Sequence, residues 1–109
     1  MSTYLIENEY TITRQQGDIS DVVFVLQNTL PLAGKTVKFH VYNTKDDCLM
    51  AKVSPDTITV VGQQITIPLL KNDTELLKGT LRWECELTSL TERITIGHGP
   101  FVVVKTHIP

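Results

Sequence analysis

Histidine and cysteine are the residue types here that most often bind transition metals, and the chain has three of the first and two of the second. A zinc site needs three or four such side chains that converge on one point. His40, His98 and His107 fall on different expected elements, and none has a second ligand at a spacing that fixes metal geometry. Cys48 and Cys85 are too few for a disulfide framework. We therefore expect surface histidines, two free and partly buried thiols, and no metal site.

Carboxylates occur in two pairs that could support other chemistry. Asp46 and Asp47 lie in the polar loop 43–47. Calcium needs several oxygen ligands at alternating positions and a glycine that bends the loop. Because this loop contains Lys45 and no glycine, we expect it to be solvated and not to bind calcium. Glu84 and Glu86 share one face of an expected strand, a spacing that could suggest the two carboxylates of a glycosidase. Because Arg82 continues the same row, we interpret this row as the solvated face of a sheet.

The sequence contains no recognisable nucleophile or phosphate-binding motif. No serine lies in a Gly-x-Ser-x-Gly context, and Gly-His-Gly-Pro at 97–100 lacks the lysine and the following helix of a phosphate loop. Trp83 could be a stacking platform for a sugar or a base, but it alternates with Leu81 and Cys85 and is expected in the core. We predict a protein that is not an enzyme and has no cofactor.

Alternation of apolar and polar residues indicates the elements that carry these side chains. In 36–42 the apolar residues Val37, Phe39 and Val41 share one face, and 81–87 repeats the pattern around Trp83. Side chains of a strand point to opposite faces with a period of two, so each segment is expected to be half buried in a sheet.

Turn residues divide the chain into short strands with almost no helix. In 19–27 both faces are apolar, so that strand is expected to be central or covered on both sides. Pro68 is expected to end its strand, and 97–100 to separate the last two strands. Asn72 is the expected N-cap of a short helical connector. The expected strands are 4–14, 19–27, 35–42, 48–53, 57–61, 64–67, 80–88, 93–96 and 101–105.

These elements predict an all-β fold, an immunoglobulin-like antiparallel β-sandwich with one short helical connector. With 109 residues the chain is expected to form a single domain, residues 1–109. A net charge of −2 without a basic patch gives no reason to expect nucleic acid as a partner. The longest apolar runs are too short to span a membrane, and no signal peptide is evident, so synthesis in a cytoplasm is expected.

Five segments, in this order, carry a resemblance to a known family. They are 13–18 (Thr-Arg-Gln-Gln-Gly-Asp), 32–39 (Leu-Ala-Gly-Lys-Thr-Val-Lys-Phe), 74–79 (Thr-Glu-Leu-Leu-Lys-Gly), 81–87 (Leu-Arg-Trp-Glu-Cys-Glu-Leu) and 97–103 (Gly-His-Gly-Pro-Phe-Val-Val). The chain resembles the immunoglobulin-like module of bacteriophage virions, of which the N-terminal domain of the siphophage baseplate upper protein is an example. The resemblance extends from about Tyr10 to Lys105.

The resemblance implies a structural component of a virion, made in the cytoplasm of a bacterial host, that docks to other phage structural proteins or to further copies of itself. It implies a place in a tail, baseplate, fibre or capsid-surface complex. Family members usually continue into a fibre, a coiled coil or a receptor-binding region, whereas this sequence ends at Pro109.

Two terminal segments, 1–9 and 106–109, are expected to be extended arms. Tyr4, Leu5 and Ile6 are the predicted partner-contact residues of the first arm. The alternative function is a carbohydrate-binding or adhesin module that recognises a glycan of the host cell surface. Tyr42, just before the polar loop, is the aromatic residue that we expect to be exposed for such a contact.

Overall fold

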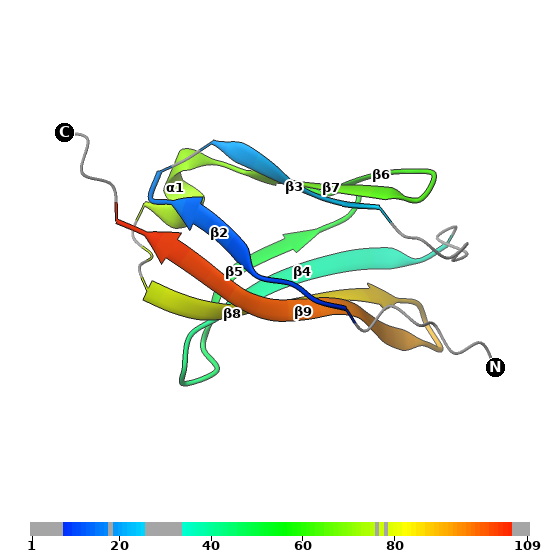
Figure 1. Ribbon diagram of the computed structural model, residues 1–109. Coiled ribbons are helices and arrows are strands. Elements are labelled where there is room, and N and C mark those ends of the chain that lie inside the picture. Colours follow the sequence, from blue (N-terminus) through cyan, green and yellow to red (C-terminus); the bar gives the residue numbers. More distant parts are fainter. Residues whose placement is uncertain (1–7, 18, 26–33, 76, 78, 106–109) are drawn as a thin grey trace.

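The computed structural model describes residues 8–17, 19–25, 34–75, 77 and 79–105, and in these residues the chain forms two β-sheets packed face to face (Figure 1). This confirms the expected all-β sandwich with one short helix. The elements are β1 (Asn8–Glu9), β2 (Ile12–Gln15), β3 (Ser20–Val25), β4 (Thr36–Tyr42), β5 (Cys48–Val53), β6 (Thr59–Val61), β7 (Gln64–Leu69), α1 (Lys71–Thr74), β8 (Gly79–Thr88) and β9 (Arg93–Val104).

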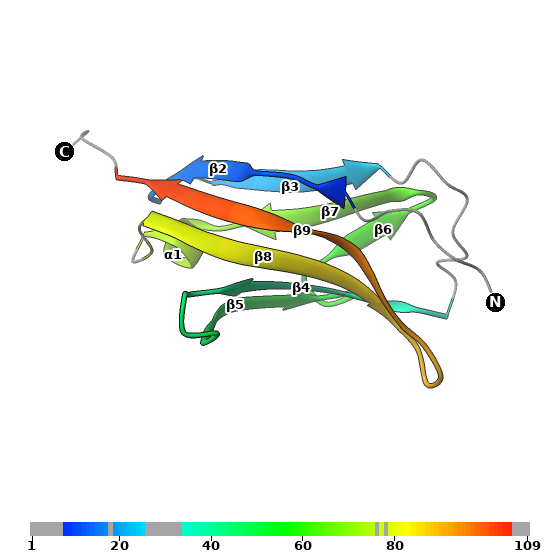
Figure 2. The same ribbon diagram turned by 60° about the horizontal axis from the view of Figure 1, so that its bottom comes forward.

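The strand order is that of an immunoglobulin-like sandwich. The larger sheet has the order β1–β9–β8–β4–β5, with β2 also beside β9, and Figure 2 shows this succession from β2 to β5. The smaller sheet has the order β3–β7–β6. In immunoglobulin terms the two sheets contain strands G, F, C and C′, and strands B, E and D. One pairing was not expected: β1 and β2 run parallel to β9, whereas the other pairs are antiparallel.

Alternate residues of the facing strands form the core. Val37, Phe39 and Val41 are buried on β4, and Trp83 and Cys85 are buried on β8, as the alternation predicted. The smaller sheet and the last strand complete the same cluster with Val22, Ile65, Ile67, Leu69, Ile96, Phe101 and Val103. The core therefore spans both sheets and uses one face of each.

Trp83 lies at the centre of this core and is fully buried. Its ring stacks on Phe24 of the smaller sheet at a centroid distance of 5.1 Å and on Phe39 of its own sheet at 5.8 Å. Its indole N–H donates a hydrogen bond of 2.9 Å to the carbonyl oxygen of Tyr10. One side chain thus joins both sheets and the chain segment between β1 and β2, and such aromatic pairs stabilise a fold by more than their buried area alone.

The expectation of a break at 97–100 is wrong, because β9 runs unbroken through Arg93–Val104. Gly97 and Gly99 do not form a turn, and instead make room for neighbouring groups. A Cβ atom on Gly97 would lie 2.8 Å from the Trp83 ring, and one on Gly99 would collide with the Tyr10 carbonyl oxygen. Both glycines therefore allow neighbouring groups to approach the strand closely.

Pro100 explains why the Tyr10 carbonyl is available to Trp83. Tyr10 donates its N–H to the His98 carbonyl at 3.0 Å, as in a parallel ladder. In such a ladder the Tyr10 carbonyl would accept the N–H two residues further along β9, at position 100, and proline has none. The ladder is interrupted between β1 and β2, and the indole N–H satisfies the remaining acceptor.

Two smaller expectations about the segment 68–79 are also wrong. Pro68 lies inside β7, opposite Asp21. Its missing N–H costs no ladder bond, because β6 pairs with β7 only at residues 64–66. The helix α1 begins with Leu70 as its N-cap rather than Asn72, and the Asp73 carboxylate accepts the Leu70 N–H at 2.7 Å.

The Asp73 carboxylate also joins the helix α1, which follows β7, to the larger sheet. The same oxygen accepts a hydrogen bond of 2.7 Å from the ammonium group of Lys52, a buried residue of the edge strand β5. Removing either partner would leave the other charge largely buried, at a cost of about 3 kcal/mol.

The contact between Gly97 and Trp83 gives a stability prediction. We expect Gly97→Ala to lower the free energy of unfolding by about 1–3 kcal/mol, because the added methyl overpacks against the indole. Urea denaturation measures the loss. Trp83→Phe shortens the ring at the point of contact, so the double variant should lose less stability than the sum of the two single variants. Simple additivity of the two losses would contradict the contact.

Candidate interaction surface

The outward face of the smaller sheet carries several exposed apolar side chains, together with the exposed Asp21 of β3. Ile19, the residue before β3, is 76% exposed. Val23 and Val25 of β3 are 50% and 65% exposed, and Val61 of β6 is 68% exposed. The outward residues of β7 between these strands are uncharged: Gln64, Thr66 and Pro68. We call Ile19, Val23, Val25 and Val61 the outer valine face. The expectation that β3 is central or covered on both sides is wrong, because β3 is an edge strand in the described part of the chain.

In the described part of the chain, the edge of β3 that is turned away from β7 pairs with no other strand. The guanidinium of Arg14, from β2, donates a hydrogen bond of 2.9 Å to the Asp21 carbonyl, so the backbone of Asp21 points away from β7. Because the direction alternates along a strand, the N–H and C=O groups of Val23 and Val25 point the same way. Among the described residues no lysine or proline of β3 protects this edge, although edge strands commonly carry them.

The outward face of the larger sheet is different, because it is charged. Lys38, His40 and Tyr42 of β4 lie opposite Glu86, Glu84 and Arg82 of β8, and His98 and Pro100 of β9 continue the rows. The expectation that this whole row is solvated is wrong at one position. Glu86 is only 5% exposed, because the exposed Arg93 of β9 lies over it and bonds its carboxylate. This ion pair raises the pKa of Arg93.

The pairing brings together two histidines that the sequence pattern places on separate elements. His40, Glu84 and His98 occupy neighbouring positions on three adjacent strands and share the outward face. In the part of the chain that the structure describes, however, no three or more His, Cys, Asp or Glu side chains are placed to hold a metal ion. His107 lies outside the described residues.

Tyr42 is half buried rather than freely exposed, and Tyr10, at 49%, is the more exposed tyrosine. The guanidinium of Arg82 lies over the Tyr42 ring at 5.5 Å from its centroid, and the His40 ring lies beside it at 5.9 Å. Burial raises the pKa of the Tyr42 phenol, and the nearby Glu84 carboxylate adds to the increase. Arg82 covers one face of the ring, so this face is closed to a stacking sugar.

The other predicted contact residues, Tyr4, Leu5 and Ile6, lie outside the described residues, as does the segment 106–109. The two cysteines differ more than expected: Cys85 is buried, but Cys48 is exposed rather than partly buried. Burial raises the pKa of the Cys85 thiol to about 12. A thiol of this kind is a core residue and not a nucleophile.

Comparison with models of known protein families gave no match, and neither did comparison with curated protein sequences. Among the described residues no helix is long and apolar enough to cross a membrane.

Sequence reasoning missed the most distinctive feature of the surface, the outer valine face. Apolar residues on both faces usually mean a covered strand, so the pattern around Val23 and Val25 predicts burial. The available signal was the pair Thr59 and Thr66, whose alternation with Val60 and Ile65 indicates that the outward face of the smaller sheet is exposed to solvent.

The difference between the two thiols can be measured. In the native protein we expect Ellman's reagent to modify Cys48 rapidly and Cys85 only after unfolding. A Cys48→Ser variant isolates the buried thiol, which should then give no fast phase. Rapid modification of native Cys48→Ser would contradict the burial of Cys85.

The same burial has a consequence for stability at high pH. The unfolded thiol ionises near its ordinary pKa of 9.0, but the folded one does so only near 12. Between these values the unfolded state binds fewer protons, so the free energy of unfolding falls as the pH rises. We expect the fall to be smaller in Cys85→Ala than in the wild type. Equal slopes in urea titrations above pH 9 would count against this account.

Proposed function

We propose that this chain is a non-enzymatic docking module of a bacteriophage virion, part of a tail, baseplate, fibre or capsid-surface complex. Its partners are other structural proteins of the particle, including further copies of the chain. It uses no cofactor and contacts neither nucleic acid nor membrane. It is made in the cytoplasm of the bacterial host and ends in the virion.

The observation that carries the docking role is the outer valine face. A surface sheet face of a monomer is normally polar, and a contiguous apolar patch marks an interaction site. Here the exposed fractions of Ile19, Val25 and Val61 all exceed 60%, and these side chains add nothing to the core of the sandwich. Covering them with a partner would contribute about 25 cal/mol for each Å² of apolar surface removed from water.

The virion assignment rests on the sequence resemblance, and the strand order is compatible with it. The resembling segments contain structurally important positions: Gly17 has a positive φ of 76° in the turn before β3, and 97–103 contains both close-approach glycines of β9. Modules that occupy symmetric positions in a particle meet their neighbours through the same surface in every copy. A face on which Asp21 is the one charged side chain of β3, beside the edge of that strand, suits such repeated contacts.

The glycan-binding alternative has less support at Tyr42, because Arg82 covers one face of that ring.

Mass spectrometry of purified particles, followed by localisation in an averaged particle image, tests the virion assignment. We expect the chain in stoichiometric amount at a fixed, symmetric position. Its absence from purified particles would contradict the proposal.

The docking face itself can be tested by a single charge. Val25→Lys places an ammonium group on the outer valine face, where a partner would have to desolvate it. We expect incorporation into particles to fall by about tenfold or more, while the melting temperature stays within a few degrees of the wild type, because surface changes usually shift stability by about 0.5 kcal/mol or less. Thr95→Lys, on an exposed position of β9, is the matched control. Normal incorporation of Val25→Lys would rule out this face.

A further inference from the structure

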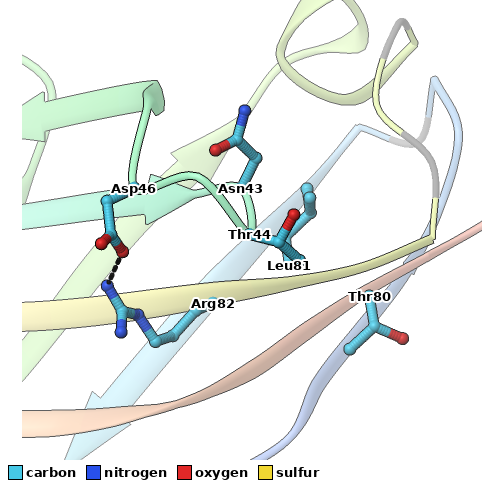
Figure 3. Close-up of a pocket in the computed structure, with 6 residues that line it drawn as sticks. All are labelled: Asn43, Thr44, Asp46, Thr80, Leu81 and Arg82. Atoms are coloured by element: carbon cyan, nitrogen blue, oxygen red, sulfur yellow. Dashed lines mark hydrogen bonds and ion pairs between the residues drawn. The ribbon is translucent and has the colours of Figure 1, made fainter.

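A shallow depression lies on the other sheet, between the loop that joins β4 to β5 and the start of β8. Its volume is about 310 Å³, and six residues line it: Asn43, Thr44, Asp46, Thr80, Leu81 and Arg82 (Figure 3). This size is at the lower end of the range of small-molecule sites, about 300–1,000 Å³. The depression is separate from the outer valine face, so ligand binding here is independent of the proposed docking role.

The loop on one side of the depression is held in place by hydrogen bonds of the Asn43 side chain. The Asn43 amide oxygen accepts the N–H groups of Lys45 and Asp47 at 2.8 and 3.0 Å, and its amide nitrogen donates to the Asp47 carboxylate at 3.1 Å. Asp46 takes a left-handed conformation, with φ of 63°. Asparagine stabilises such turns by replacing backbone partners. The loop therefore presents Asp46 in a defined position without needing a ligand to order it.

The opposite side is formed by Arg82, whose guanidinium is also fixed. It bonds the Asp46 carboxylate at 2.8 Å, lies 3.7 Å from the Glu84 carboxylate, and rests over the Tyr42 ring. An anionic ligand would meet two carboxylates here, and a cationic ligand would meet the guanidinium. The charge arrangement therefore favours a neutral ligand that can accept from the remaining guanidinium N–H groups and donate to the carboxylate oxygens.

The rest of the lining combines free hydroxyls with an apolar side chain. The hydroxyl groups of Thr44 and Thr80 make no hydrogen bond to any described residue, and the half-buried Leu81, which also packs against the core, adds apolar surface to the lining. A sugar ring has hydroxyls that both donate and accept, and a C–H surface that packs on apolar side chains. We propose that this depression binds one neutral sugar ring, such as the terminal pyranose of a glycan.

Titration of the isotopically labelled chain with glucose, galactose and N-acetylglucosamine, each added separately and followed by two-dimensional NMR, tests this proposal. At least one sugar should produce saturable shifts confined to 43–46 and 80–82, with a Kd on the order of 1 mM, since a shallow site makes few contacts. Inorganic phosphate, titrated in parallel, should produce weaker shifts at these positions.

Two variants and a control locate the site. Thr80→Val removes one hydroxyl with little change of shape and should weaken binding about fivefold. Arg82→Lys keeps the charge but loses the planar set of donors, and should weaken binding about tenfold. Thr95→Val changes a similar exposed strand threonine outside the depression and should leave binding unchanged.

Three outcomes would overturn the proposal. The first is no saturable shift with any of the three sugars, and the second is a stronger response to phosphate than to sugar. The third is sugar binding that both Thr80→Val and Arg82→Lys leave intact, since the sugar would then lie elsewhere.

Discussion

The packing of Trp83 between Phe24 and Phe39 is the interaction on which the rest of this structure depends. It crosses the space between the two sheets, where immunoglobulin domains commonly have a disulfide packed against a tryptophan. Here the cysteine of β8, Cys85, is a free buried thiol, and the cross-sheet contact is aromatic instead. Stacked rings hold two layers together only if the indole is fixed, and the hydrogen bond to the Tyr10 carbonyl fixes it.

This arrangement of Trp83 determines several features of its surroundings. Gly97 must lack a side chain to admit the ring, and Pro100 must lack an N–H for the Tyr10 carbonyl to be free. Cohesion of the fold therefore comes from the interior, together with the ion pair between Lys52 and Asp73. The exposed valines of β3 and β6 have no part in it. For this reason we propose that they contact a partner, and that the charged face of the larger sheet, with its shallow depression, has a separate role.

The sequence was sufficient to predict the elements in which one face is buried and the other is polar. In β4 and β8 the alternation is regular, and both strands, their inward residues and the sandwich class were predicted correctly. The errors arose where a residue type has two physical uses. The glycines and the proline at 97–100 resemble a turn. In the structure Gly97 leaves room for the Trp83 ring, and Pro100 has no N–H to bond the Tyr10 carbonyl. Both roles depend on residues far away in the sequence.

The surface was harder to predict than the core for a related reason. Apolar residues on both faces of β3 have the same pattern whether protein or solvent covers the strand. The burial of Glu86 depends on Arg93, which a register shift in the pairing of β8 with β9 brings close to it. The depression joins residues of one loop and one distant strand, so local patterns could not indicate it. Tyr42 was correctly placed beside the polar loop, but its cover, Arg82, also comes from the neighbouring strand.

The burial of Trp83 can be tested most directly by acrylamide quenching of its fluorescence, which is unambiguous because the chain has a single tryptophan. With the ring fully buried, we expect the native protein to be quenched several times less than the urea-unfolded chain, and its emission to shift to longer wavelength on unfolding. Equal quenching of the native and unfolded protein would show an indole exposed to solvent, and the cross-sheet stack could not then hold this sandwich together.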